Sequence, residues 1–214
     1  ALNKARARLV VEEILQLQLA LALLRSSSKS ETGLVLDSGG EIVKQFVSNL
    51  PFCLTNAQRK VIKEIFRDMA DGCKAMTRLL QGDVGSGKTV VAMAAILQAV
   101  GSGYQAAMMA PTEVLAGQHF GSLVRAFDPL GIEVAFLVGS QSKSERDAVL
   151  TRISSGQARV VVGTHALIQD TVIFNNLGIV VTDEQHRFGV RQRTLLQDKG
   201  NNPHVLVMTA TPIP

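Results

Sequence analysis

The chain has 214 residues, 46% of them hydrophobic, which suits one ordinary domain with an appendage and excludes a globally disordered protein. Its 22 lysines and arginines outnumber its 18 aspartates and glutamates, so the formal charge is +4. This charge permits a polyanionic partner but does not establish one.

The two cysteines, Cys53 and Cys73, have neither CxxC spacing nor a neighbouring pair of histidines. We therefore expect no zinc site and no disulfide framework, and a reducing compartment fits. The most apolar N-terminal run, "ILQLQLALALL", contains two glutamines and is shorter than the roughly 20 apolar residues that a bilayer requires. The sequence thus predicts a cytoplasmic protein without a membrane partner.

The first fifty residues predict an α-helical linker segment, residues 1–50. Leucines and valines recur at helical spacing over residues 4–25, and the polar run "SSSKSETG" that follows indicates an exposed loop. A second, shorter helical pattern covers residues 41–50 and ends before Pro51. The remaining residues, 51–214, are expected to form the main domain.

From Thr55 onward, helical and strand patterns alternate along the chain. This alternation predicts an α/β domain, a parallel sheet with helices on both faces. The apolar, β-branched runs "RVVVG" and "GIVV" suit central strands that are buried on both sides. Helices are expected over residues 55–70, 88–100, 113–127 and 143–153, and strands over residues 76–81, 104–110, 132–138, 158–164, 177–183 and 204–209.

The segment "GDVGSGKT", Gly82 to Thr89, matches the phosphate-loop pattern G-x-x-x-x-G-K-[ST] in full. Glycines let the loop curl so that backbone N–H groups and the start of the next helix face an anion. Lys88 would reach the outer phosphates of a nucleotide, and the Thr89 hydroxyl would bind Mg²⁺. An ordinary glycine-rich turn is the alternative. The expected nucleotide-binding residues are Gly82, Asp83, Val84, Gly85, Ser86, Gly87, Lys88 and Thr89.

Two carboxylates, Asp183 and Glu184, follow the apolar strand "GIVVT". An ionised carboxylate at the end of a buried strand costs desolvation free energy unless a cation lies beside it. Asp183 suits Mg²⁺ coordination, through water, and Glu184 suits activation of an attacking water. A solvated acidic turn is the alternative, and the phosphate loop favours the functional interpretation.

The segment "LTNAQ" has two interpretations. Thr55 followed by Gln58 three residues later predicts a capping box at a helix N-terminus. The Gln58 carboxamide could also pair with both the donor and the acceptor edge of adenine, which would favour ATP over GTP. The guanine-reading pattern N-K-x-D is absent.

Together with "APTEVLAGQH", "GTHALIQ", "DEQHRFGVRQR" and "TATPIP", these motifs resemble the first motor domain of superfamily 2 helicases, and most closely the RecG-type helicases. The resemblance covers residues from about 50 to 214, and the N-terminal helix is similar to the segment before the motor in that family. It implies a RecA-like P-loop NTPase lobe. The related Mfd translocases usually read DEEH, so Gln185 and Glu113 favour the RecG type; an Mfd-like lobe is the alternative.

The resemblance implies roles for further residues. Phe52 would stack near the nucleotide base, and His186, Thr209 and Thr211 would couple the nucleotide site to the rest of the motor. The residues placed in DNA-backbone motifs are Pro111, Thr112, Glu113, Gly163, Thr164 and His165.

Structural explanations remain open for several of these positions. Pro111 and Thr112 could form a strand end and a helix cap, and His165 could be a core histidine. Arg187, Arg191 and Arg193 could form a solvated basic face.

The function that the resemblance implies is ATP hydrolysis, with Mg²⁺, that drives movement on double-stranded DNA and remodelling of branched DNA. Catalysis would fall to Lys88, Asp183 and Glu184. No motif resembles the arginine finger of a second motor lobe or the wedge domain that grips branched DNA, so we expect these partners elsewhere in a longer protein. A nucleotide-dependent interaction module that hydrolyses no ATP is the alternative of another class, and the intact catalytic set argues against it.

Overall fold

The computed structural model describes residues 33–183 and 195–210, and within the N-terminal helix Arg8, Val11, Glu12, Ile14, Leu15, Gln18 and Leu19. The chain divides into two compact units, Ala1–Thr32 and Gly33–Pro214. All described residues of the first unit are helical, and Arg8 donates to Glu12 one turn later at 3.0 Å. The rest of the helix expected over residues 4–25 lies outside the described residues.

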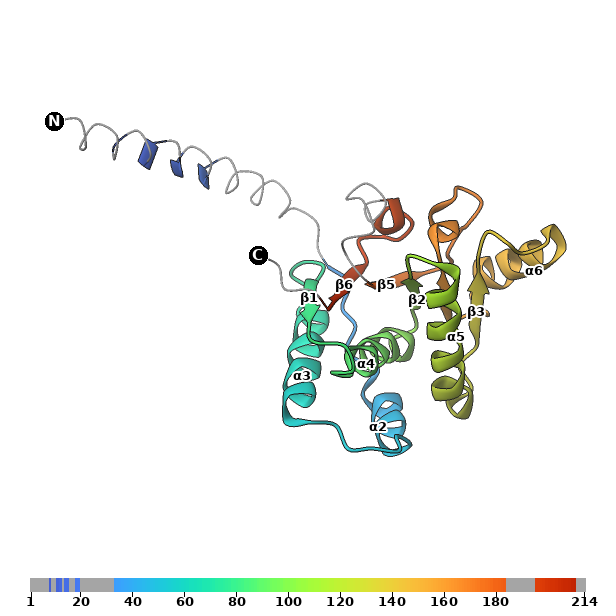
Figure 1. Ribbon diagram of the computed structural model, residues 1–214, viewed down its shortest axis with the longest axis horizontal. Coiled ribbons are helices and arrows are strands. Elements are labelled where there is room, and N and C mark those ends of the chain that lie inside the picture. Colours follow the sequence, from blue (N-terminus) through green and yellow to red (C-terminus); the bar gives the residue numbers. More distant parts are fainter. Residues whose placement is uncertain are drawn as a thin grey trace. The chain divides into compact units, whose positions relative to one another are not determined.

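The second unit is built on a parallel sheet of six strands in the order β1-β6-β5-β2-β4-β3 (Figure 1). Every described strand pair is parallel, which confirms the expected α/β fold. The strands are β1 (Thr77–Gln81), β2 (Gln105–Met109), β3 (Val134–Leu137), β4 (Val160–Gly163), β5 (Leu177–Asp183) and β6 (His204–Thr209).

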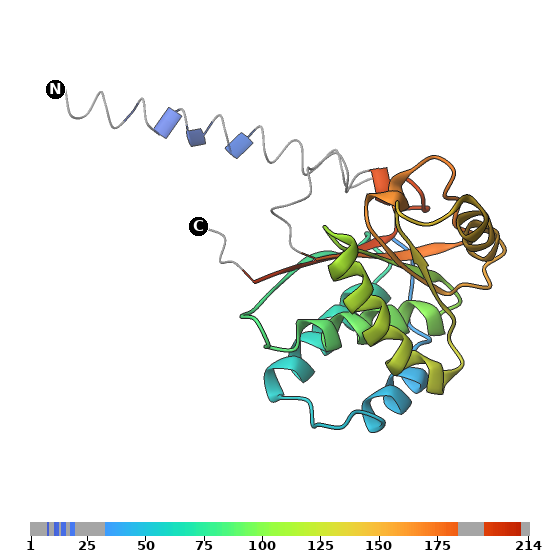
Figure 2. The same cartoon turned by 45° about the vertical axis from the view of Figure 1, so that its right-hand side comes forward.

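Helices cover both faces of this sheet because successive side chains of the central strands alternate between two hydrophobic clusters. Ala106 and Met108 of β2 belong to one cluster, and Ala107 and Met109 belong to the other. Figure 2 shows the resulting two layers of helices. The first layer holds α2 (Gly40–Ser48), α3 (Asn56–Ala70), α4 (Lys88–Gly101) and α5 (Glu113–Phe127); the second holds α6 (Lys143–Ser154) and the 3₁₀ turn η2 (His165–Ile168).

Helix α4, which follows the phosphate loop, is the most deeply buried helix of the described chain. Every residue from Val90 to Val100 is buried. A helix that is apolar all round belongs inside a protein, and α4 packs between the sheet, α2 and α3. The loop is therefore attached to a fixed element. None of the helices in the described part combines the length and the hydrophobicity that a membrane span requires.

Residues 33–50 belong to the same compact unit as the sheet, although the sequence assigns them to the N-terminal segment. The Gln98 side chain of α4 donates to the Leu36 carbonyl at 2.8 Å, and Leu36 N–H donates to Met69 O of α3 at 2.9 Å. Gly39 and Gly101 touch so closely that a Cβ atom on Gly101 would lie 2.5 Å from Gly39 Cα. The compact unit accordingly begins at Gly33.

Candidate nucleotide site

Three segments of the candidate site meet at the carboxyl edge of the sheet. The phosphate loop follows β1, Thr209 ends the neighbouring β6, and Asp183 ends β5 beside it. Gly82 N–H donates to the Thr209 carbonyl at 3.3 Å, so the first residue of the loop is bonded to the end of β6. Ligands of open α/β sheets bind at this edge, where the strands end.

The loop adopts a backbone that requires glycine at two positions. Gly85 has φ 80° and Gly87 has φ 81°, both in the left-handed region. Helix α4 begins at the next residue, and Gly87 caps it without a side-chain hydrogen bond. The first N–H groups of α4 are thus available to an anion, with the positive end of the helix dipole behind them.

Lys88 lies across the loop. Its ammonium group donates to the carbonyl oxygens of Gly82 at 2.7 Å and Asp83 at 2.9 Å. Within the part of the chain that the structure describes, Lys88 forms no ion pair with a carboxylate. A phosphate would be a stronger, charge-assisted partner for this ammonium than a neutral carbonyl.

Gln58 joins the start of α3 to the loop. The capping box is confirmed, because Gln58 Oε1 accepts from Thr55 N–H at 2.9 Å and Thr55 Oγ1 accepts from Gln58 N–H at 3.2 Å. Gln58 Nε2 also donates to the Ser86 carbonyl at 2.9 Å. A carboxamide has two lone pairs and two N–H donors, so one of each is still available. The capping role leaves the predicted contact with adenine possible.

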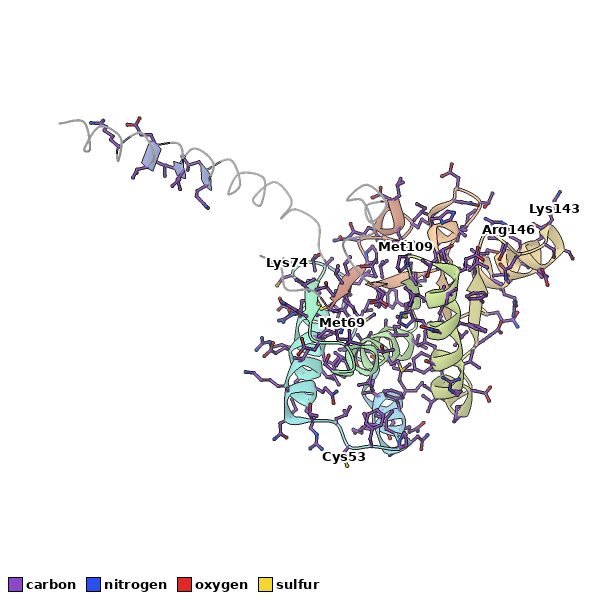
Figure 3. The ribbon with its side chains drawn as sticks, in the orientation of Figure 1. Cys53, Met69, Lys74, Met109, Lys143 and Arg146 are labelled. Atoms are coloured by element: carbon purple, nitrogen blue, oxygen red, sulfur yellow. The ribbon has the colours of Figure 1, made fainter. Side chains whose placement is uncertain are left out.

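An open pocket of about 540 Å³ lies between the end of α2 and the start of α3. Phe52 belongs to its lining and is 52% exposed, so the ring is accessible to a ligand. Cys53, labelled in Figure 3, lies on the same loop. Stacking of Phe52 near a nucleotide base stays a prediction. The lining residues are Val47, Ser48, Leu50, Pro51, Phe52, Cys53, Leu54 and Arg59.

Asp183 is held by a residue to which the sequence assigned no role. Asp183 Oδ2 lies 2.6 Å from His119 Nε2, and the two side chains are 16% and 12% exposed. His119 belongs to α5, 64 positions earlier in the chain. Its only signal in the sequence is its place in "APTEVLAGQH", where the spacing gives no indication of a contact with Asp183.

The oxygen donors at this edge suit Mg²⁺. Asp183 offers a carboxylate and Thr89, in the first turn of α4, offers a half-buried hydroxyl. No group of three histidine, cysteine or acidic side chains that could enclose a metal occurs among the described residues. Mg²⁺ is commonly bound by one or two carboxylates together with nucleotide phosphates, so these residues fit an ion that binds with the nucleotide.

Several predicted site residues lie outside the described residues. These are Glu184, His186 and Thr211, together with Arg187, Arg191 and Arg193. Their roles stay predictions. Thr209 is described: it is buried, and the Gly82 contact joins it to the phosphate loop. The predicted coupling role of Thr209 is not tested by this contact. The contact shows only that the end of β6 is bonded directly to the phosphate loop.

The predicted DNA contacts after β2 lie at the N-terminus of α5. Thr112 is exposed and caps this helix, since its hydroxyl accepts from Leu115 N–H at 3.3 Å. Glu113 bonds to the loop after β3, where its carboxylate accepts from Ser140 N–H at 3.1 Å and from Ser140 Oγ at 2.6 Å. The Ser140 hydroxyl bond lowers the pKa of Glu113, so this carboxylate stays anionic. An anion does not attract a DNA phosphate, whereas Pro111 and Thr112 remain accessible.

The predicted DNA contacts after β4 divide into buried and exposed residues. His165 is exposed, so the alternative of a core histidine is wrong. Gly163 is buried, and a Cβ atom there would lie 2.1 Å from the Leu137 carbonyl, so close packing of β4 on β3 requires glycine. Thr164 is 2% exposed, and its hydroxyl has no hydrogen-bond partner among the described residues. Only His165 of these three presents a side chain to a partner.

Comparison with known proteins points to helicases. Residues 55–214 match the DEAD/DEAH box helicase family. The whole chain is 49% identical to the ATP-dependent DNA helicase RecG of Thermotoga maritima and 52% identical to that of Synechocystis, and it covers 27% and 26% of them. A solved structure of RecG bound to a three-way DNA junction matches 100% of the chain with a TM-score of 0.86 and 47% identity, over 28% of its own length. The chain therefore spans about a quarter of the length of these relatives.

Proposed function

Because this chain belongs to the DEAD/DEAH box helicase family, we propose that it is the ATP-binding motor lobe of a RecG-type DNA helicase. ATP binds at the loop from Gly82 to Thr89, and its hydrolysis drives movement on double-stranded DNA and remodelling of branched DNA in recombination and repair. The observation that carries the proposal is the meeting of the loop, Thr209 and Asp183 on three neighbouring strand ends. RecG relatives at half identity favour this type over an Mfd-like translocase.

Each residue of the proposed site has one task. Lys88 exchanges its two carbonyl partners for the outer phosphates, and Asp183 with Thr89 holds the Mg²⁺ that accompanies them. The ion supplies positive charge where negative charge develops in phosphoryl transfer. Glu184, next to Asp183 in the chain, orients the attacking water and takes its proton.

The proposed DNA surface consists of the accessible residues Pro111, Thr112 and His165. Hydroxyl and strand-end N–H groups suit contacts to phosphates, which position DNA without reading its sequence. The aromatic content is 4% with no tryptophan, so extensive stacking on bases is not expected from this lobe. The RecG structure bound to a DNA junction supports branched DNA as the partner.

The other domains that a RecG-type helicase needs are proposed to lie elsewhere in a longer protein. The chain covers 27% of its Thermotoga relative, which leaves room for a second motor lobe with an arginine finger and for a wedge domain. A cytoplasmic location is proposed with it, because Cys53 and Cys73 are exposed free thiols of the kind that a reducing compartment preserves.

The proposal is tested by nucleotide binding to the 214-residue chain. Calorimetry with Mg·ADP is expected to give an affinity for Lys88→Ala at least tenfold below that of the wild type, since a charge-assisted contact contributes about 1.5–3 kcal/mol. Lys74→Ala is the matched control, because Lys74, labelled in Figure 3, is exposed and precedes β1 in the chain. Lys88 follows that strand and the phosphate loop. Equal affinities for the wild type and Lys88→Ala would refute nucleotide binding at this loop.

A further inference from the structure

His119 contacts Asp183 in a geometry that specifies the hydrogen bond. The two atoms, His119 Nε2 and Asp183 Oδ2, are 2.6 Å apart, and both side chains are largely buried. An ionised carboxylate can only accept hydrogen bonds, so Nε2 carries the proton and donates it to Oδ2. A hydrogen bond of this length to a carboxylate is among the stronger ones in proteins.

The imidazole is fixed by the helix that carries it. Ala116, Leu123 and Phe127 of α5 are fully buried in the core, and Phe120, next to His119, packs on Phe136 of β3 with ring centroids 5.1 Å apart. These contacts prevent α5 from turning about its axis. The backbone from which His119 reaches Asp183 is therefore held in place by the core and not by the bond to Asp183.

No other side chain of the described residues bonds to Asp183. Lys88, the cation of the phosphate loop, donates to Gly82 O and Asp83 O instead. Since Oδ2 is engaged by His119, Oδ1 is the oxygen that remains for a further partner. Carboxylates that bind metals are commonly oriented in this way by a hydrogen bond to a neighbouring group.

We propose that His119 is the positioning residue of the Mg²⁺ site: its bond to Oδ2 holds the Asp183 carboxylate so that Oδ1 is presented to the ion or to its bound water. This inference rests on the proposed function, in which Asp183 contributes to Mg²⁺ binding. Loss of such an orienting bond typically lowers metal affinity about 10- to 100-fold. In this role His119 acts on the ion through Asp183 and is not itself a ligand.

The test compares binding of ADP with a fluorescent ribose label in excess MgCl₂ and in excess EDTA, for the full 214-residue chain. The ratio of the two affinities measures what Mg²⁺ contributes, without any turnover. His119→Ala is expected to lower this ratio about tenfold while the affinity in EDTA is unchanged. Asp183→Ala sets the size of the complete loss. Gln118→Ala, an exposed neighbour on α5, is the matched control and is expected to behave as wild type.

A conservative variant separates the hydrogen bond from a general role in packing. His119→Gln places an amide N–H near the position of Nε2 and is expected to keep most of the Mg²⁺ response, and thermal unfolding of each variant monitors the fold. An unchanged ratio in His119→Ala would overturn the inference. So would an equal loss of affinity in MgCl₂ and in EDTA, or a His119→Gln variant as defective as His119→Ala. If the wild type itself shows no gain from Mg²⁺, the proposed function fails instead, and the inference with it.

Discussion

Gln58 Nε2 donates to the Ser86 carbonyl at 2.9 Å, so the first turn of α3 braces the phosphate loop from the side. The same side chain closes the capping box with Thr55. The contact is close enough that a Cβ atom on Gly87 would lie 2.3 Å from Gln58 Nε2. The start of α3 and the phosphate loop are thus joined through one carboxamide. Substitution of Gln58 is therefore expected to affect both the stability of the domain and nucleotide binding.

Gln58→Ala is expected to lower the affinity for ATP and to reduce the preference for ATP over GTP, because the adenine contact and the loop brace are both lost. Loss of the bond from Thr55 N–H to the Gln58 side chain, one half of the capping box, should also cost about 0.5–1.5 kcal/mol of unfolding free energy. Thr55→Ala is the control: it removes the cap hydroxyl but keeps the Gln58 carboxamide and its bond to Ser86. Calorimetry with both nucleotides and urea unfolding measure these effects. Equal affinities of the wild type for ATP and GTP would leave Gln58 with its capping and bracing roles alone.

Gln105→Leu is expected to destabilise the domain by about 3 kcal/mol or more, since buried polar groups left without partners cost about 1–3 kcal/mol each. The buried carboxamide donates to Ile153 O and Ala158 O and accepts from the N–H groups of Asn175 and Asn176. The exposed Gln157 supplies the matched control, Gln157→Leu. Urea unfolding should separate the two variants clearly, and similar midpoints would contradict the prediction.

The secondary structure follows closely from the sequence, and the site does so only in part. Helix starts at Thr55 and Thr112 are marked by capping residues, as expected, and their hydroxyls accept N–H groups of the first turn. Ser142 caps α6 in the same way, although we did not predict this cap from the sequence. Buried strands are marked by β-branched runs, such as residues 160–163. Both signals are local, so they can be read from adjacent residues.

Strand order and long-range contacts have no such local signal. Nothing in the sequence indicates that β6, the last strand, lies between β1 and β5, or that His119 meets Asp183. The packing of residues 33–50 on the domain depends partly on backbone contacts, such as Leu36 N–H with Met69 O, and a backbone group carries no mark in the sequence. These features come from tertiary packing, which local patterns do not specify.

His204 is expected to make stability fall as the solution becomes acidic. It is fully buried, accepts from Met76 N–H through Nδ1 at 2.9 Å and lies 2.9 Å from Leu34 O through Nε2. Burial lowers the pKa of His204 below its ordinary value of 6.5, so the folded protein binds this proton less readily than the unfolded chain. Its contribution is complete above about pH 6.5 and is lost as the pH falls below that value.

The variant His204→Asn removes this titration. It should be less stable than the wild type at neutral pH, yet its unfolding free energy should depend less on pH over the range in which histidine titrates. Urea unfolding at a series of pH values gives both quantities. Parallel pH profiles for the two proteins would show that another group is responsible.

Substitution of Glu184 should slow ATP hydrolysis without weakening ATP binding. In a longer protein that carries the second motor lobe, Glu184→Gln is expected to bind ATP as the wild type does and to hydrolyse it very slowly. The substitution keeps the size and hydrogen bonding of the side chain but removes the carboxylate that takes the proton.

The 214-residue chain alone should neither unwind forks nor show strong DNA-stimulated turnover, because an arginine finger contributes about 10³ to 10⁵ in rate and no residue of this chain is proposed to act as one. ATPase and fork-unwinding assays on both proteins measure these outcomes. Near-normal turnover by Glu184→Gln would exclude it as the base, and robust DNA-stimulated turnover by the chain alone would mean that it carries its own catalytic arginine.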